Sequence, residues 1–142
     1  MELKFKIAGG DFTNAGNASS AVKKILKQLN IDHTISKRIV VALYEAEVNI
    51  VAHAFSGIID VNIDENRIHI ILDDKGPGIT DIEKAMEIGF STASPQVREM
   101  GFGAGMGLAN MKRNADKLLI SSEPGKGTKV ELIHYLRTNA GK

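Results

Sequence analysis

The sequence predicts an α+β fold, a two-layer sandwich in which a mixed, mostly antiparallel sheet carries helices on one face. Two kinds of spacing lead to this prediction: alternating apolar residues indicate strands, and apolar residues three or four positions apart indicate helices. The order of the elements is strand, two helices, a strand hairpin, short helices and a second hairpin. Such an order suits helices gathered on one face, which leaves the other face to water or to a partner.

The first part of the chain predicts one strand and two helices. Residues 3–7 alternate apolar and basic side chains, as a half-buried strand does, and two glycines follow them. Residues 18–29 repeat apolar side chains at helical spacing. The second helix follows a short connector, with Thr34 or Ser36 as candidates for its N-cap, and residues 55–57 end it.

The second part predicts two hairpins on either side of a glycine-rich region. Residues 58–63 and 67–72 have the pattern of two strands joined by a short turn. Residues 73–78 then predict a loop that suits neither a helix nor a strand. The remaining predicted elements are a helix at 81–88, a mobile glycine-rich lid at about 89–106, a helix at 108–115 and strands at 118–122 and 128–136.

The composition is that of an ordinary globular protein, and we expect one domain over residues 1–142. The 18 basic and 17 acidic residues nearly cancel, so the overall charge does not predict binding to nucleic acid or to an acidic membrane. The absence of cysteine excludes disulfides, thiolate metal sites and cysteine nucleophiles, and fits a reducing compartment. No apolar run approaches the length of a membrane span, so we expect a cytoplasmic protein.

The second predicted helix carries a polar face. Glu45, Asn49 and His53 follow one another at a spacing of four, which places a carboxylate, a carboxamide and an imidazole one turn apart. This pattern predicts either a binding or catalytic face or a polar stripe toward water. Glu47 lies about half a turn from Glu45, so we expect it to face solvent or a partner and to take no part in catalysis.

A second motif follows an apolar strand. Asp74 is succeeded by Gly76 and Gly78, two residues that let a backbone approach a ligand closely. A carboxylate at that point can accept a hydrogen bond from an amino group such as that of adenine. An ordinary strand-to-helix turn would explain the same residues.

A third motif runs directly into a predicted helix. Gly103, Gly105 and Gly107 precede Leu108, and such glycines can present main-chain N–H groups and a helix N-terminus to a phosphate. Their spacing matches neither the dinucleotide-binding fingerprint nor the P-loop. A flexible hinge without a ligand is the alternative.

Taken in this order, the motifs resemble those of the GHKL, or Bergerat-fold, ATP-binding superfamily. The likeness is greatest to the small stand-alone serine kinases that act as bacterial anti-sigma factors and partner-switching regulators. The residues that carry it are Glu45, Asn49 and His53; Asp74, Gly76 and Gly78; Gly103, Gly105, Gly107 and Leu108; and Gly127 with Thr128. The resemblance implies ATP and Mg²⁺ as the cofactors.

The resemblance also implies roles for these residues. Asn49 would complete the coordination of Mg²⁺, and Glu45 would be the general base that takes a proton from a substrate serine or from water. Asp74 would accept the adenine amino hydrogen with support from Thr128 through water, and the glycines would contact the nucleotide. His53 occupies a position that often carries a phosphate-directed residue, although packing near the lid would also explain it.

The implied function is that of an ATP-dependent serine-protein kinase, an anti-sigma factor or partner-switching regulator that phosphorylates a small antagonist protein. A sigma factor and a second copy of the chain are further candidate partners, and we expect no direct contact with nucleic acid or membrane. Two alternatives remain open: an ATP-binding switch without catalysis, and a detached catalytic domain of the histidine-kinase type.

Overall fold

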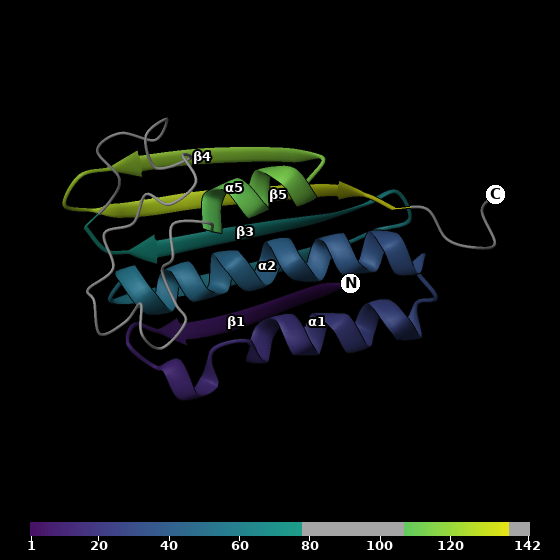
Figure 1. The fold of residues 1–142 in the computed structure, drawn as a ribbon, viewed down its shortest axis with the longest axis horizontal. Coiled ribbons are helices and arrows are strands. Elements are labelled where there is room, and N and C mark those ends of the chain that lie inside the picture. The colour runs from purple at the N-terminus through teal and green to yellow at the C-terminus, as the bar shows by residue number, and fades with distance from the viewer. Residues whose placement is uncertain (78–106, 137–142) are drawn as a thin grey trace.

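The computed structural model describes residues 1–77 and 107–136, which form a two-layer sandwich (Figure 1). The strands are β1 (Glu2–Ala8), β2 (Ser56–Ile63), β3 (Arg67–Lys75), β4 (Lys117–Glu123) and β5 (Gly127–Tyr135). The helices are a short 3-10 turn η1 (Phe12–Asn14), α1 (Asn17–Gln28), α2 (His33–His53) and α5 (Gly107–Asn114). The predicted helix at 81–88 and the predicted lid at 89–106 lie outside the described residues.

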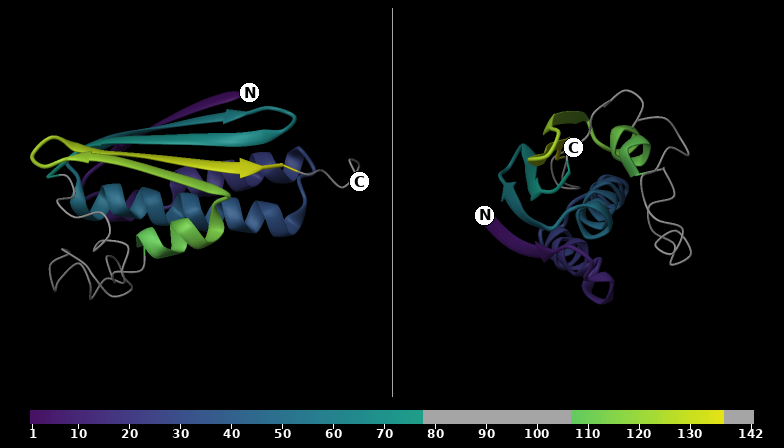
Figure 2. Two further views of the ribbon diagram at one scale, coloured as in Figure 1. Left: turned by 90° about the horizontal axis from the view of Figure 1, so that it is seen from above. Right: turned by 90° about the vertical axis from the view of Figure 1, so that its left-hand side faces the viewer.

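The five strands form one sheet in the order β1-β2-β3-β5-β4. Each neighbouring pair is antiparallel, so the strands that the structure describes contain no parallel pair. Figure 2 shows α1, α2 and α5 together on one face of the sheet. The predicted α+β fold with helices on one face is therefore confirmed.

The core lies between the sheet and the helices. Alternate side chains of the central strands point toward it, and Ile59, Val61, Ile70 and Leu72 are almost completely buried there. Leu43 of α2 is fully buried above them. Because each such side chain contributes roughly 1.5–3 kcal/mol when buried, apolar packing holds α2 firmly on the sheet. None of the helices in the described ranges is long and apolar enough to cross a membrane.

The N-terminus of α2 differs from the prediction. The helix begins at His33, and Asp32 caps it by accepting a hydrogen bond from the Ile35 N–H at 3.2 Å. The prediction that Thr34 or Ser36 provides the cap is wrong, because both residues already lie in the first helical turn. Asp, Ser and Thr are all good N-cap residues, so residue type alone does not choose between adjacent candidates.

Strand β3 is longer than predicted. Asp73, Asp74 and Lys75 belong to the strand, so the prediction of a loop at these three positions is wrong. They pair with the first three residues of β2, and Asp73 also pairs with Lys129 of β5. Pairing with β2, and at Asp73 also with β5, overrides the low strand propensity of aspartate. Asp74 therefore projects from a paired strand.

Candidate active site

Glu45, Asn49 and His53 form a polar strip along α2. They lie one turn apart, and all three side chains are half-buried. The adjacent residues Ala46 and Ile50 are buried in the core. The strip therefore lies at the border of the core, where one side of each polar group is supported by packing and the other side is accessible.

The start of α5 lies beside α2 (Figure 1). A Cβ placed on Gly107 would lie 3.4 Å from Asn49 Oδ1 and 3.6 Å from Glu45 Oε2. Nearly one turn further along α5, Asn110 Nδ2 donates a hydrogen bond to Glu45 Oε1 at 3.3 Å. The structure thus brings together Glu45, Asn49 and Gly107, which come from two motifs far apart in the sequence.

Asp74 projects from the end of β3 and is held by the start of β5. The Thr128 N–H donates directly to Asp74 Oδ1 at 3.0 Å, and Thr128 Oγ1 lies 2.9 Å from Ser122 Oγ. Gly127 has a φ of 147°, and a Cβ there would collide with the Asp74 carbonyl oxygen, so the close approach of the strands requires glycine. Burial raises the pKa of Asp74, the Thr128 N–H opposes the rise, and the charge of Asp73 adds to it.

Two further glycines bring the end of the sheet close to α2. A Cβ on Gly57 would lie 2.9 Å from Ile50 Cδ1 and 3.4 Å from Asp74 Cβ, so Asp74 and α2 flank the same glycine. A Cβ on Gly76 would lie 3.0 Å from Ala54 Cα, which is tighter than ordinary contact. Gly76 therefore has a packing role at the end of α2, whatever else its backbone contacts.

The comparison with known families identifies the family of this chain. The family of histidine kinase-, DNA gyrase B- and HSP90-like ATPases matches residues 34–138. The chain belongs to this family. The matched range includes α2, β3, α5 and β5, the elements that carry the polar strip, Asp74 and Thr128.

Relatives of this ATPase chain include a serine/threonine-protein kinase and anti-sigma F factors. It is 35% identical over 119 residues to the serine/threonine-protein kinase RsbT of Bacillus subtilis (strain 168), which covers 81% of this chain and 84% of RsbT. It is 38% identical over 146 residues to the anti-sigma F factor of Caldanaerobacter subterraneus subsp. tengcongensis, which covers 98% of this chain and 95% of that protein. The likeness to these two proteins therefore extends over most of each chain.

Solved structures share the ATPase fold at low sequence identity. The structure of the RsbU and RsbW domains of Rv1364c from Mycobacterium tuberculosis matches with a TM-score of 0.65 and 16% identity, over 96% of this chain and 32% of that one. The mycobacterial sensor histidine kinase MprB matches with a TM-score of 0.55 and 18% identity, over 97% of this chain and 99% of that one. At these identities the likeness shows the fold alone.

His53 lies at the end of α2 that faces the glycine-rich turn of β3. Burial lowers its pKa, so the imidazole of this ATPase is neutral at pH 7. A neutral imidazole can offer a hydrogen bond to a phosphate without adding a charge. Contact with a phosphate and packing near the lid both remain predictions for His53.

The glycine motifs are described in part. Gly78, Gly103 and Gly105 lie outside the described residues. Gly107 and Leu108 begin α5, where the Leu108 side chain is buried in the core and Gly107 faces the strip on α2. Leu108 therefore anchors α5 through its side chain, and its main chain is the part that a nucleotide could contact.

Glu47 does not face solvent or a partner, and that prediction is wrong. Its side chain is completely buried, where Oε2 accepts hydrogen bonds from the N–H groups of Gly16 at 2.9 Å and Ala18 at 3.2 Å. Its Oε1 accepts from the Ser19 N–H at 3.0 Å and from Ser19 Oγ at 2.6 Å. Gly16, the N-cap of α1, has no side chain that could cap, so Glu47 of α2 caps α1 instead.

Sequence reasoning missed the contacts that hold the site residues. Asn110 had a signal, because it is a polar residue within a predicted helix, three positions after a motif glycine. Ser122 and Ser19 had none, since serines in a strand or helix are common. Their partners, Thr128 and Glu47, lie on other elements and become neighbours only in the fold.

We predict that Glu47→Ala destabilises the protein by at least about 3 kcal/mol, because it removes the acceptor of three main-chain N–H groups, two of them buried, and the shorter of the two hydrogen bonds of the Ser19 hydroxyl. Urea unfolding followed by circular dichroism measures the change. The matched control is Glu45→Ala on the same helix, which removes one half-exposed hydrogen bond and should lower stability by about 1 kcal/mol or less. Equal stability of the two variants would contradict the capping role of Glu47.

Proposed function

We propose that this protein is an ATP-dependent serine-protein kinase that acts as an anti-sigma factor or partner-switching regulator and phosphorylates a small antagonist protein. One observation carries the proposal: a carboxylate and a carboxamide, Glu45 and Asn49, lie side by side at the start of α5. The names of the relatives, a serine/threonine-protein kinase and anti-sigma F factors, support the choice of substrate class. The absence of cysteine is consistent with action in the cytoplasm.

The described residues fit a nucleotide with Mg²⁺. No hydrogen bond reaches the Asn49 side chain within residues 1–77 and 107–136, and a carboxamide oxygen is a suitable Mg²⁺ ligand. No group of three acidic, histidine or cysteine side chains in these ranges could hold a metal alone, so phosphate oxygens and water would complete its shell. Mg²⁺ would supply neutralisation of the phosphate charge.

Asp74 fits the recognition of adenine. Its Oδ1 is occupied by the Thr128 N–H, whereas Oδ2 accepts no hydrogen bond from the part of the chain that the structure describes. An amino group is the natural donor to such an oxygen, and adenine presents one where guanine presents a carbonyl. Asp74 would therefore select adenine, and Asn49 would hold Mg²⁺. Glu45 would then be the residue that acts as the general base.

Glu45 has a free oxygen for the transfer step. Oε1 is bound by Asn110, and Oε2 accepts no hydrogen bond in the described ranges. As the substrate serine oxygen bonds to the γ-phosphorus, Glu45 takes its proton, and the bond from the γ-phosphorus to the bridging oxygen breaks to leave ADP. Phosphoryl transfer otherwise needs positioning and charge neutralisation, which the surrounding residues would provide.

The experiment is phosphate transfer from labelled Mg-ATP to a purified anti-sigma-factor antagonist protein of the same organism. We predict acid-stable phosphoserine on the antagonist and a loss of about 100-fold or more in kcat for the isosteric Glu45→Gln variant. Calorimetry should show that Glu45→Gln still binds ATP. Tight ATP binding without transfer would instead indicate a non-catalytic switch, and an acid-labile phosphate would indicate a histidine acceptor.

We predict that Asn49→Ala removes the Mg²⁺ dependence of ATP binding, because the protein then lacks its oxygen ligand for the ion. Calorimetric titrations with ATP, with and without Mg²⁺, measure this dependence. Asn62→Ala, which changes an exposed residue of β2, is the control and should bind as the wild type does. An unchanged Mg²⁺ effect in Asn49→Ala would rule out the metal-binding role.

We predict that Asp74→Asn lowers the preference for ATP over GTP by about tenfold or more. The remaining amide oxygen would keep the Thr128 N–H, so the new NH₂ group would face the base and repel the adenine amino group. Competition between ATP and GTP for a fluorescent ATP analogue measures the ratio. Asp73→Asn, at the exposed neighbouring position of β3, should leave the ratio unchanged.

A further inference from the structure

We propose that Asn110 of α5 is a positioning residue that orients the Glu45 carboxylate and selects Oε2 as the oxygen that takes the proton. The inference rests on the proposed function, because it assigns a purpose to a contact of the proposed base. It concerns a residue outside the four motifs on which the resemblance depends.

The contact between the two side chains is specific. Asn110 Nδ2 donates to Glu45 Oε1 at 3.3 Å across the junction of α5 and α2. Both side chains are half-buried, so water competes less for this bond than at a free surface. With Oε1 bound, Oε2 is the oxygen directed at Gly107, the residue that begins α5. Within residues 1–77 and 107–136, the carboxylate is thereby held with one bound oxygen and one that accepts no hydrogen bond.

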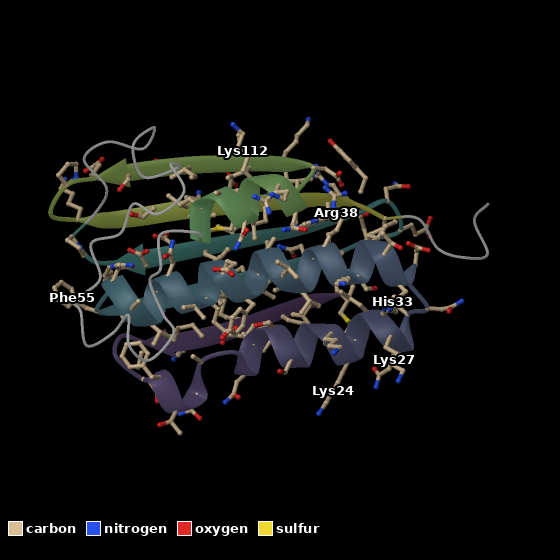
Figure 3. All side chains as sticks on the ribbon, in the orientation of Figure 1. Lys24, Lys27, His33, Arg38, Phe55 and Lys112 are labelled. Carbon is tan, nitrogen blue, oxygen red and sulfur yellow. The ribbon has the colours of Figure 1, made fainter. Side chains whose placement is uncertain are left out.

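The helix that carries Asn110 is itself fixed on both sides. Leu108 and Met111 are buried in the core beneath it. At the far end, Arg38 of α2 donates to the Arg113 carbonyl at 3.4 Å and pairs with Asp116 at 3.5 Å. Figure 3 shows Arg38 where the far end of α5 meets α2. Asn110 therefore projects from an anchored helix, as a group that orients another should.

Orientation matters because a glutamate on a helix surface is otherwise free to rotate. A free carboxylate presents either oxygen in several rotamers, and few of these place a lone pair on a hydroxyl proton. A hydrogen bond from a fixed amide removes that freedom before the substrate arrives. Asn110 also lies three residues after Gly107, so the first turn of α5 binds the proposed base through Asn110 and lies beside the proposed metal ligand Asn49 at Gly107.

A role in helix packing alone is the competing explanation, and two substitutions separate the explanations. Asn110→Ala removes the donor. Asn110→Asp keeps the shape but replaces the donor by an acceptor beside a carboxylate, so the hydrogen bond becomes a repulsion. If packing alone mattered, the isosteric Asp variant would be the milder one. If orientation matters, it is the more damaging one.

The experiment measures kcat and KM for Mg-ATP in two separate assays. One follows phosphate transfer to the antagonist protein, and the other follows slow ATP hydrolysis, in which water accepts the phosphate. We expect Asn110→Ala to lower kcat about tenfold with KM for ATP within about twofold of wild type, and Asn110→Asp to lower kcat further. Asn114→Ala, one turn along α5, removes a local hydrogen bond to the Asn110 carbonyl and should leave kcat unchanged. Thermal unfolding should show all three variants folded at the assay temperature.

Three results would overturn the inference: wild-type kcat in Asn110→Ala, a raised KM with kcat unchanged, or a smaller loss in Asn110→Asp than in Asn110→Ala. An independent readout is the ¹H–¹⁵N signal of the Asn110 side-chain amide, which should move in Glu45→Gln and stay in place in Asn62→Ala. If the wild type transfers no phosphate, the proposed function fails, and if Glu45→Gln turns over like the wild type, the proposed base role of Glu45 fails with the present inference. If Glu45→Gln is inactive while Asn110→Ala is fully active, only the present inference fails.

Discussion

The site depends on the way α2 is enclosed. The sheet lies beneath this helix and α1 and α5 flank it, so most of its surface is in contact with protein (Figure 2). A helix returns to the same side every three to four residues, which leaves one narrow border for polar groups. Glu45, Asn49 and His53 occupy that border. Their position along this border therefore follows from the apolar packing of the whole helix, and Asn110 then holds the Glu45 carboxylate.

Two carboxylates fix the positions of the elements around α2 by accepting hydrogen bonds from main-chain N–H groups. Glu47 of α2 binds the first turn of α1, and Asp74 of β3 binds the start of β5. Hydrogen bonds to charged groups contribute about 1.5–3 kcal/mol each, but burial of the charge costs a comparable amount. The main gain is geometric, because each carboxylate has one arrangement in which its donors are all satisfied. Such bonds specify where α1 and β5 must lie.

Much of the fold and part of the site could be predicted, because they follow from local geometry. Strand and helix periods are visible within a few residues, and the alignment of Glu45, Asn49 and His53 requires only that the segment be a helix. Apart from the N-cap of α2, where adjacent residues compete, the wrong predictions fall where a distant segment decides the outcome. Asp73 to Lys75 became strand because β2 pairs with all three and β5 pairs with Asp73, and a short window of sequence contains neither neighbour.

Glu45 and Glu47 show what the sequence decides and what the tertiary structure decides. The sequence by itself determined the α+β class, the polar spacing on α2 and the order of the motifs that places the chain among the ATPases. It presented two identical side chains two positions apart, with no sign of their different surroundings. Only the tertiary structure turned Glu45 toward α5 and Asn110, and Glu47 into the first turn of α1. The physical reason is that a buried charge needs donors, and those donors come from segments brought close by folding.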